Sequence, residues 1–454
     1  MLNSETIVAP ATSVGGGGVA IIRISGSESL SSLQRFFRPP RTISSFETHK
    51  FYYGHFIDSD QQVVDEVMVV YMQQPRSYTR EDVIEIHCHG GRVVVRQIID
   101  CLLTGGIRVA NPGEFTLRAF LNGRIDLSEA EAVIDLLESR SEAASHVALR
   151  QLGGALSRKI FDYRDRLLEM VALVEAYIDF PEDDMETPHV HSLRNNCNII
   201  LAEINELLVG FEEGRLLREG LSVLILGKPN VGKSSLLNLL LGQDRAIVTD
   251  IPGTTRDLIE ESIILSGVPL TIIDTAGIRD TSDPIESDGV KRAKGKISSA
   301  DIVLYVVDGA GEFVGEVHDD LSMLSDRPVV VVVNKSDQSN FSVPDPLSGF
   351  NCVAMSAKFN RGLESLTKAI FASLNISGQE TGESTLVSDR RHRDALVRAE
   401  SYMKQFLEGL DNDLSDEFLS IHLRDALSAL GEITGETTPD EILNSIFSRF
   451  CIGK

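Results

Sequence analysis

The 454-residue sequence lacks long apolar runs and a leader-like N-terminus. No apolar stretch approaches the roughly 18 residues that a helix needs to span a bilayer, so a membrane-spanning chain is not expected. The opening stretch, MLNSETIVAPATSV, has an acidic residue and no basic segment ahead of an apolar one, which argues against a secretory signal. We therefore expect a cytoplasmic protein with no membrane association.

Cysteine is scarce and has no metal-binding spacing. The five residues, Cys88, Cys101, Cys197, Cys352 and Cys451, form no CxxC pair, which argues against a structural zinc site and against a disulfide framework. We expect reduced and mostly buried thiols.

Positive charge is also in deficit. There are 43 Lys and Arg residues against 67 Asp and Glu residues, which gives a formal net charge of -24. Binding to nucleic acid phosphates requires clustered basic side chains, so a broad electrostatic surface for nucleic acid is disfavoured. Such contact would need a local basic patch or a partner. The densest candidate, DRRHRDALVR at 389–398, could equally be the solvated face of a helix start.

The length allows roughly two to four domains, and the residue patterns change along the chain accordingly. Residues 1–118 predict a mixed, strand-rich unit, with strands in GVAIIRISG, VDEVMVVYM and DVIEIHCHGG and a helix in GGRVVVRQIIDCLLTGG. Residues 119–216 predict helices, residues 217–379 alternate strand and helix, and residues 380–454 return to helices. The economical interpretation is one helical domain with an α/β domain inserted between its two halves.

The first helical stretch has a recognisable start. SEAEAVIDLLESRSEAASHVALRQL and ALSRKIFDYRDRLLEMVALVEAYIDF predict two long amphipathic helices, with Ser128 as the N-cap of the first and Glu131 as its capping-box partner. In the inserted domain, continuous apolar strands such as ADIVLYVVDGA and RPVVVVVNKSD predict a parallel sheet with helices on both faces.

A phosphate loop is the most specific motif. GKPNVGKS at 227–234 follows the predicted strand LSVLIL and precedes the predicted helix SSLLNLLLG, which is the context that this motif requires. Gly227 and Gly232 let successive N–H groups point at phosphate oxygens, and the helix N-terminus reinforces that field. Lys233 would reach the β and γ phosphates, and Ser234 would ligate Mg²⁺.

Three further motifs follow in the order expected of a GTP-binding domain. DTAG at 274–277 places Asp274 near the metal and Gly277 near the γ-phosphate. NKSD at 334–337 offers Asp337 as acceptor for the guanine N1 and N2 protons, which adenine does not present. SAK at 356–358 would add a backbone contact near the base. Each motif is weak alone, but four at strand C-terminal ends together predict GTP binding.

The water-positioning residue of Ras-like enzymes is missing. Ile278 stands where such enzymes have glutamine, so another group must orient the attacking water. Asn230 lies inside the phosphate loop, and its amide oxygen, together with carbonyls of the switch loop TDIPGTTRD at 249–257, could hold a monovalent cation. The alternative is an amide that only stabilises the loop.

The whole chain closely resembles the MnmE (TrmE) family of tRNA modification GTPases. The resemblance rests on the phosphate loop with its asparagine, on GTTRD, on DTAGIRD, on the insertion of the GTPase between helices, and on four further segments: RISG at 23–26, PGEFTLRAFLNGRIDL at 112–127, AAS at 143–145 and CIGK at 451–454.

This resemblance implies a fold and an activity. It implies a P-loop GTPase domain at 217–379 inserted into a helical domain at 119–216 and 380–454, after an α+β tetrahydrofolate-binding and dimerisation domain at 1–118. The protein would hydrolyse GTP with Mg²⁺ and K⁺. With the flavoprotein MnmG, which carries FAD, it would form a carboxymethylaminomethyl-type group at C5 of the wobble uridine of certain tRNAs.

The resemblance also implies partners and a one-carbon donor. The chain would form a homodimer whose G domains pair in the presence of potassium, and a heterotetramer-type complex with MnmG. A tetrahydrofolate derivative, in the 5-formyl or 5,10-methylene form, would carry the one-carbon unit.

The family's nucleotide-site residues transfer by motif. Ser234 and Thr255 would hold Mg²⁺, and Glu286 would orient the attacking water, although by itself it reads as a surface carboxylate. The potassium ligands would be Asn230 and the backbone carbonyls of Thr249, Ile251 and Thr254. The full set implied for GTP is Asn230, Val231, Gly232, Lys233, Ser234, Ser235, Thr249, Asp250, Ile251, Pro252, Gly253, Thr254, Thr255, Asp274, Thr275, Ala276, Gly277, Asn334, Lys335, Asp337, Ser356, Ala357 and Lys358.

The implied folate residues are Arg23, Glu85, Arg124 and Lys454. An acid such as Glu85 suits the donor face of a pterin, and the arginines offer charge to the folate carboxylates. Position 124 is Arg where we expect Lys in many members of the family. The glycine run VGGGG at 14–18 stands where the family has a segment with more proline. Catalytic candidates are Glu286, Lys233 and Cys451; the thiol could be a nucleophile, a buried plug or part of the site.

Two other functions compete with this interpretation. A regulatory GTPase acting in ribosome assembly, without modification chemistry, would share the GTP motifs but would need a basic RNA-binding appendage. An autonomous folate enzyme is disfavoured because no GxGxxG flavin fingerprint follows a strand.

Overall fold

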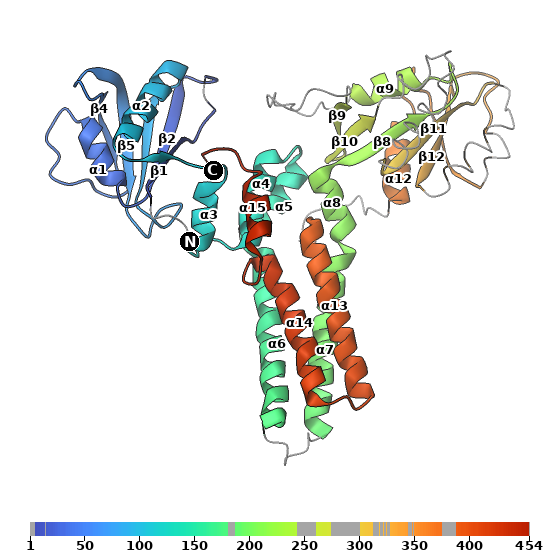
Figure 1. The fold of residues 1–454 in the computed structure, drawn as a ribbon. Helices are drawn as coiled ribbons and strands as arrows, with labels where there is room; N and C mark the ends of the chain where they lie inside the picture. The colour runs from blue at the N-terminus through green and yellow to red at the C-terminus, as the bar shows by residue number, and fades with distance from the viewer. Residues whose placement is uncertain are drawn as a thin grey trace, which may run out of the picture. The chain divides into compact units, whose positions relative to one another are not determined.

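The computed structural model describes residues 5–13, 15–179, 187–242, 260–273, 300–311, 317, 321, 324, 327–343, 347, 349–374 and 387–453 (Figure 1). The chain divides into two compact units. One comprises Met1–Ile134 and Gly431–Lys454, and the other comprises Asp135–Leu430. None of the described helices is long and apolar enough to cross a membrane.

The first unit is built on a seven-stranded sheet in the order β3-β4-β5-β6-β2-β1-β7. Its strands are β1 (Ile7–Pro10), β2 (Val19–Ser25), β3 (Phe37–Arg38), β4 (Phe51–Ile57), β5 (Val63–Met72), β6 (Val83–His89) and β7 (Arg108–Val109). Neighbouring strands are antiparallel except β1 and β7. The predicted strands and the helix after them are therefore confirmed.

Alternation along β2 and β6 decides which side chains reach the core. Helices α1 (Ser29–Phe36) and α2 (Arg92–Thr104) share an apolar core with the sheet, to which β2 contributes Ile22 and Ile24. Arg23, which lies between these two isoleucines, therefore points to the opposite face. Its register partner on β6 is Glu85, so the strand pairing alone brings these two charged residues together.

Helices α3 (Glu114–Leu121) and α15 (Asp440–Phe447) pack in the first unit with the start of α4 (Leu127–Glu138). The apolar contact includes Phe120 and Phe447, whose ring centroids lie 6.2 Å apart. The C-terminal helix is thus anchored beside the segment PGEFTLRAFLNG, far away in sequence.

The predicted N-cap of α4 was wrong. Asp126, not Ser128, caps the helix: its carboxylate accepts a hydrogen bond from the Glu129 N–H at 2.9 Å, and the Glu129 carboxylate accepts one from the Asp126 N–H at 2.9 Å. This reciprocal pair is a capping box two residues upstream of the predicted one. Ser128 instead lies within the first turn and donates to Asp126.

The single long helix predicted from residue 128 to 152 is also wrong, because it is divided into α4 and α5 (Glu142–Leu152). Ser141 adopts an extended conformation, and its hydroxyl accepts from the Ala144 N–H at 3.2 Å. Serine is a favoured N-cap residue, so a new helix begins at this position. The apolar periodicity continues across the break, although the backbone helix does not.

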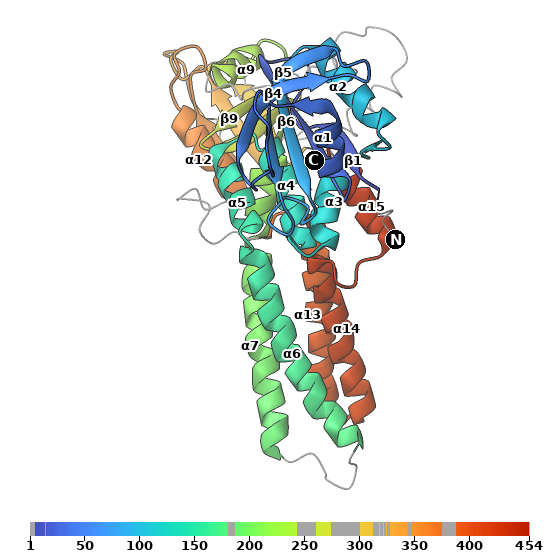
Figure 2. The ribbon, with the colours of Figure 1, turned by 90° about the vertical axis from the view of Figure 1, so that its left-hand side faces the viewer.

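Long helices form a bundle in the second unit, and two perpendicular views show them running alongside one another (Figures 1 and 2). They are α6 (Ala155–Asp179), α7 (Thr187–Val209), α13 (Arg390–Asp411) and the part of α14 (Asp416–Thr434) that belongs to this unit. Cys197 on α7 is buried in this bundle, with its sulfur 3.6 Å from the Met403 carbonyl oxygen of α13. Segments separated by the whole inserted domain therefore share one apolar core.

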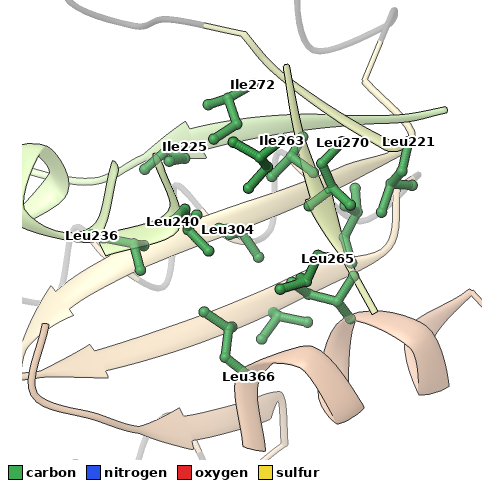
Figure 3. Close-up of a cluster of buried hydrophobic side chains, with 14 of the residues drawn as sticks. Leu221, Ile225, Leu236, Leu240, Ile263, Leu265, Leu270, Ile272, Leu304 and Leu366 are labelled. Atoms are coloured by element: carbon green, nitrogen blue, oxygen red, sulfur yellow. The ribbon is translucent and has the colours of Figure 1, made fainter. Parts of the chain in front are cut away.

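The inserted α/β fold has a six-stranded sheet in the order β13-β12-β11-β8-β10-β9. Its described elements are β8 (Leu221–Leu226), α9 (Lys233–Leu241), β9 (Glu260–Leu265), β10 (Val268–Ile273), β11 (Ile302–Asp308), β12 (Val329–Asn334), β13 (Asn351–Ala354) and α12 (Leu363–Ser373). All strand pairs are parallel except β9 and β10, a hairpin that the sequence did not predict. Figure 3 shows the leucine and isoleucine side chains that meet between its strands and helices.

Helix α8 (Phe211–Glu219) leads from the bundle into β8 and carries two arginines that hold this junction. Arg218 pairs with Asp135 at 2.7 Å and with Asp389 at 2.6 Å, and these carboxylates raise its pKa. Arg215 pairs with Asp301, just before β11, at 3.0 Å. Asp389 also caps α13, so the basic stretch 389–398 is the capped start of a helix.

Candidate functional site

The phosphate loop joins β8 to α9, as its motif requires. Gly227, Asn230 and Gly232 all have positive φ, at 138°, 62° and 102°. A side chain on Gly227 would collide with the Val306 carbonyl oxygen, so only glycine allows this close approach to β11. Gly232 is the N-cap residue of α9, whose N–H groups therefore begin directly after the loop.

Lys233 lies at the first turn of α9 and folds back over the loop. Its ammonium donates to the carbonyl oxygens of Gly227, at 2.9 Å, and Lys228, at 2.7 Å. Ser234 and Ser235 follow on the same turn and are exposed, while Val231 is buried in the sheet core. The loop thus presents a cation, hydroxyls and a helix N-terminus together, which is the chemistry of a phosphate site.

Asn334 connects the base-reading motif to the phosphate loop. It ends β12, it is buried, and its amide Nδ2 donates to the Val231 carbonyl oxygen at 2.9 Å. Its Oδ1 accepts from the Ala357 N–H at 3.0 Å. The Asn334 amide also occupies the space that a side chain at position 232 would need, so this close approach requires Gly232. Three segments far apart in sequence are held in register by this one amide.

Asp337 is exposed at the edge of this arrangement and keeps its charge. The Ser356 hydroxyl donates to its Oδ1 at 2.6 Å, and this hydrogen bond is the main cause of a lowered Asp337 pKa. Lys358 nearby lowers it further. A carboxylate held ionised and exposed is suited to accept two N–H groups from one planar ring.

One residue of this site was missed by sequence reasoning. Asp308, at the end of β11, pairs with Lys335 at 2.5 Å. Lys335 has a positive φ of 71°, so the ion pair holds a left-handed residue between Asn334 and Asp337. The only sequence signal was an acidic residue at the C-terminal end of a buried strand, in VVDG.

Several predicted residues lie outside the described residues, and their roles stay predictions. They are Thr249, Asp250, Ile251, Pro252, Gly253, Thr254, Thr255, Asp274, Thr275, Ala276, Gly277, Glu286 and Lys454, together with Ile278 of the missing-glutamine argument.

A second group of predicted residues meets on the first unit. Arg23 Nε and Nη2 lie 2.9 and 2.8 Å from Glu85 Oε1, and both side chains are largely buried. The Arg23 guanidinium lies over the rings of Tyr78, at 5.4 Å, and Phe115, at 5.7 Å. Arg124 also lies over Tyr78, at 4.6 Å. The structure therefore brings these three predicted residues together around a tyrosine that the sequence did not single out.

The C-terminal tail returns to the same sheet. Gly453 has a φ of 101° and is buried, and a side chain there would collide with the Pro10 carbonyl oxygen at the end of β1. Pro10 pairs with Ile22, the neighbour of Arg23, so the tail ends next to the strands that carry the second group. Cys451 is exposed within this tail.

The other thiols are poor nucleophiles. Burial raises the pKa of Cys88 to about 11 and the pKa of Cys197 to about 12, and it raises the pKa values of Cys101 and Cys352 as well. No cluster of three or more His, Cys, Asp or Glu residues that could hold a metal occurs in the described part of the chain.

The sheet order, the loop between β8 and α9 and the NKSD motif at the end of β12 define a P-loop GTPase. Family models described as "MnmE helical domain" and "GTP-binding protein TrmE N-terminus" match residues 127–451 and 6–124. The tRNA modification GTPases MnmE of Syntrophotalea carbinolica, Geobacter metallireducens and Natranaerobius thermophilus are 53%, 48% and 43% identical over 100% of both chains. The chain belongs to the MnmE family, and the resemblance seen in its motifs is confirmed.

Proposed function

We propose that this chain is a potassium-activated GTPase that acts with the flavoprotein MnmG on tRNA. Together they form a carboxymethylaminomethyl-type group at C5 of the wobble uridine. The observation that carries the proposal is the presence of two sites in one chain: a guanine-type nucleotide site around Asn334 and a second site around Arg23, Glu85 and Arg124. A regulatory GTPase without modification chemistry would have no use for the second site.

The nucleotide site supports GTP as the substrate. Asp337 would accept the guanine N1 and N2 protons, while Lys233 and the N-terminus of α9 would hold the phosphates. Mg²⁺ would be held by Ser234, whose exposed hydroxyl lies in the first turn of α9, and by Thr255. Glu286 would orient the attacking water in place of the missing glutamine.

The left-handed conformation of Asn230 fits a role for its amide at the mouth of the loop. A non-glycine residue with positive φ is uncommon, although asparagine tolerates it best. The exposed Asn230 amide would hold K⁺ together with the carbonyls of Thr249, Ile251 and Thr254. Bound there, the cation supplies positive charge next to the β and γ phosphates, where a transition state gains negative charge.

The second site fits a tetrahydrofolate derivative. The acid Glu85 matches the donor groups of a pterin, and the exposed charge of Arg124 matches the carboxylates at the other end. Lys454 and Cys451 would complete this site from the C-terminal tail, which Gly453 holds against β1. The domain at 1–118 would bind the folate and form the homodimer, and FAD would belong to MnmG in a heterotetramer-type complex.

Mass spectrometry of tRNA nucleosides from cells that lack this chain tests the proposal. We expect the C5-modified wobble uridine to disappear and to return when the wild-type gene is supplied. Unchanged wobble uridines, with a ribosome-assembly defect in the same cells, would favour the regulatory alternative. The purified chain provides an independent readout through GTP hydrolysis in potassium.

A further inference from the structure

We propose that Arg80 and Arg124 form a subsite for the glutamate tail of the folate, and that the chain therefore prefers poly-γ-glutamyl folates to the monoglutamate. This inference rests on the proposed folate-binding function. It assigns a direction to the ligand and adds Arg80, which neither the motifs nor the family resemblance singled out.

The charge of Arg23 is balanced by the Glu85 carboxylate. Two of its nitrogens lie within 2.9 Å of the same Glu85 oxygen, and both side chains are mostly buried. The pair is neutral overall and leaves the second Glu85 oxygen, Oε2, 3.7 Å from His87 Nε2. This end of the site offers an acceptor to ring N–H groups and little net charge to carboxylates, so it suits the pterin.

Arg124 is placed differently. Its guanidinium lies over the Tyr78 ring at 4.6 Å, and its Nη1 donates to the Tyr78 carbonyl oxygen at 3.0 Å. The side chain is exposed, and no carboxylate among the described residues pairs with it. Its position is therefore fixed by a ring and a carbonyl, while its charge is left for an anion.

Arg80 shows the same feature on the neighbouring loop. Its Nη1 donates to the Asn122 carbonyl oxygen at 3.0 Å, and it has no acidic partner within the described ranges. Its backbone has a φ of 57°, a left-handed conformation that an L-residue adopts at a cost. Glycine would adopt this backbone with less strain, so we infer that the Arg80 side chain contributes an interaction that offsets the strain.

The two loops are tied together. Besides the contacts of Arg80 and Arg124, the Asn122 side chain donates to the Thr79 carbonyl oxygen at 2.7 Å. Glu85 pairs with Arg23, both Arg23 and Arg124 lie over the Tyr78 ring, and Arg80 lies two residues after Tyr78 on the same loop. The acceptor Glu85 therefore lies at one end of these contacts and the two exposed arginines lie at the other. Folate has a matching separation, with hydrogen-bond donors on the pterin at one end and carboxylates at the other.

Calorimetric titration of the full-length chain with 5-formyltetrahydrofolate as the monoglutamate and as the pentaglutamate tests this inference. We expect the pentaglutamate to bind about three- to tenfold more tightly at low ionic strength, because each exposed ion pair adds a modest gain. The ratio should shrink toward one near ~0.5 M salt, where the Debye length is only a few ångströms.

Arg80→Gly separates charge from folding. Glycine accepts the left-handed backbone, so we expect an undiminished unfolding temperature, yet a pentaglutamate-to-monoglutamate ratio that falls toward one. Arg80→Lys keeps the charge and should retain most of the ratio. The matched control is Arg76→Ala, which removes an exposed arginine from the same loop and should leave the ratio unchanged.

The outcomes are distinguishable. If the wild-type chain binds both folates equally, or if Arg80→Gly keeps the full preference, the tail subsite is wrong while folate binding stands. If the wild-type chain binds neither folate, the proposed folate site fails and the subsite fails with it.

Discussion

The buried side chain of Asn334 donates a hydrogen bond to the backbone carbonyl oxygen of Val231 at 2.9 Å, across 103 positions of sequence. This contact joins the motif that would read guanine to the loop that would hold the phosphates. Binding of the base and binding of the phosphates are therefore expected to depend on the same side chain.

Asn334→Ala is the first test of this dependence. The change leaves the Val231 carbonyl and the Ala357 N–H without a buried partner, which costs about 1–3 kcal/mol per group. We expect GDP and GTP affinities to fall roughly tenfold to a hundredfold, measured by titration with a fluorescent GDP analogue. Asn340→Ala removes an exposed amide that donates to the Ala310 carbonyl oxygen, and it should change the affinities little. Equal affinities for both variants would contradict the linking role.

Ser356→Ala should shift the pH dependence of guanine nucleotide binding. The Ser356 hydroxyl is the main cause of the lowered Asp337 pKa, so the carboxylate acceptor persists as the pH falls toward that lowered value. Without the hydroxyl the pKa rises, and GDP affinity should be lost at a higher pH than in the wild type. Titrations from about pH 5 down to about pH 3, which span the ordinary Asp pKa of 3.8 and the range below it, measure this shift. A control, Ser373→Ala, alters a hydroxyl on α12 and should keep the wild-type curve.

Asn230→Gly tests the potassium site without straining the loop, since glycine tolerates a φ of 62°. In the wild type we expect GTP turnover to be at least about tenfold faster in potassium than in sodium, because a held cation stabilises the transition state. The glycine variant should lose this difference while still binding GDP. Equal wild-type rates in the two salts would remove the cation role of Asn230.

Cys451 should be the most reactive thiol of the native chain. It is exposed, whereas burial raises the pKa of Cys88 to about 11 and that of Cys197 to about 12. Because the thiolate is the nucleophile, iodoacetamide at pH 8 should alkylate Cys451 first. Peptide mass spectrometry identifies the site, and Cys451→Ser should abolish the fast phase. Rapid labelling of Cys88 or Cys197 in the native chain would contradict their burial.

Gly453→Ala should displace the C-terminal tail from β1. The new Cβ would meet the Pro10 carbonyl oxygen, and the φ of 101° is strained for alanine. We expect loss of wobble-uridine modification with GTP turnover near wild type, since the nucleotide loops belong to the other unit. Gly349→Ala is the matched control, because a Cβ there meets no atom within 4 Å. Full modification activity in Gly453→Ala would show that the tail need not pack there.

Local patterns predicted most elements but not their ends. Apolar residues recur at helical spacing on both sides of residues 139–141. The pattern therefore predicted one helix, whereas Ser141 caps the start of a second. Likewise, Ser128 and Glu131 have the right spacing for a capping box, but Asp126 and Glu129 form it two residues earlier, where the N–H groups of Asp126 and Glu129 are the ones bonded. Such competition between neighbouring polar side chains is decided by backbone geometry that spacing does not contain.

The sequence by itself determined the chemistry of the nucleotide site, since the motifs from Gly227 to Lys358 carry fixed residue types at fixed strand ends. It also determined that Arg23 and Glu85 could meet, because alternation places both on one face once their strands pair. Only the tertiary structure decided that Asn334 links two motifs, that Asp308 holds Lys335, and that Tyr78 lies beneath both Arg23 and Arg124. These contacts join segments separated by tens of residues, and their geometry is set by packing of the whole sheet rather than by local sequence.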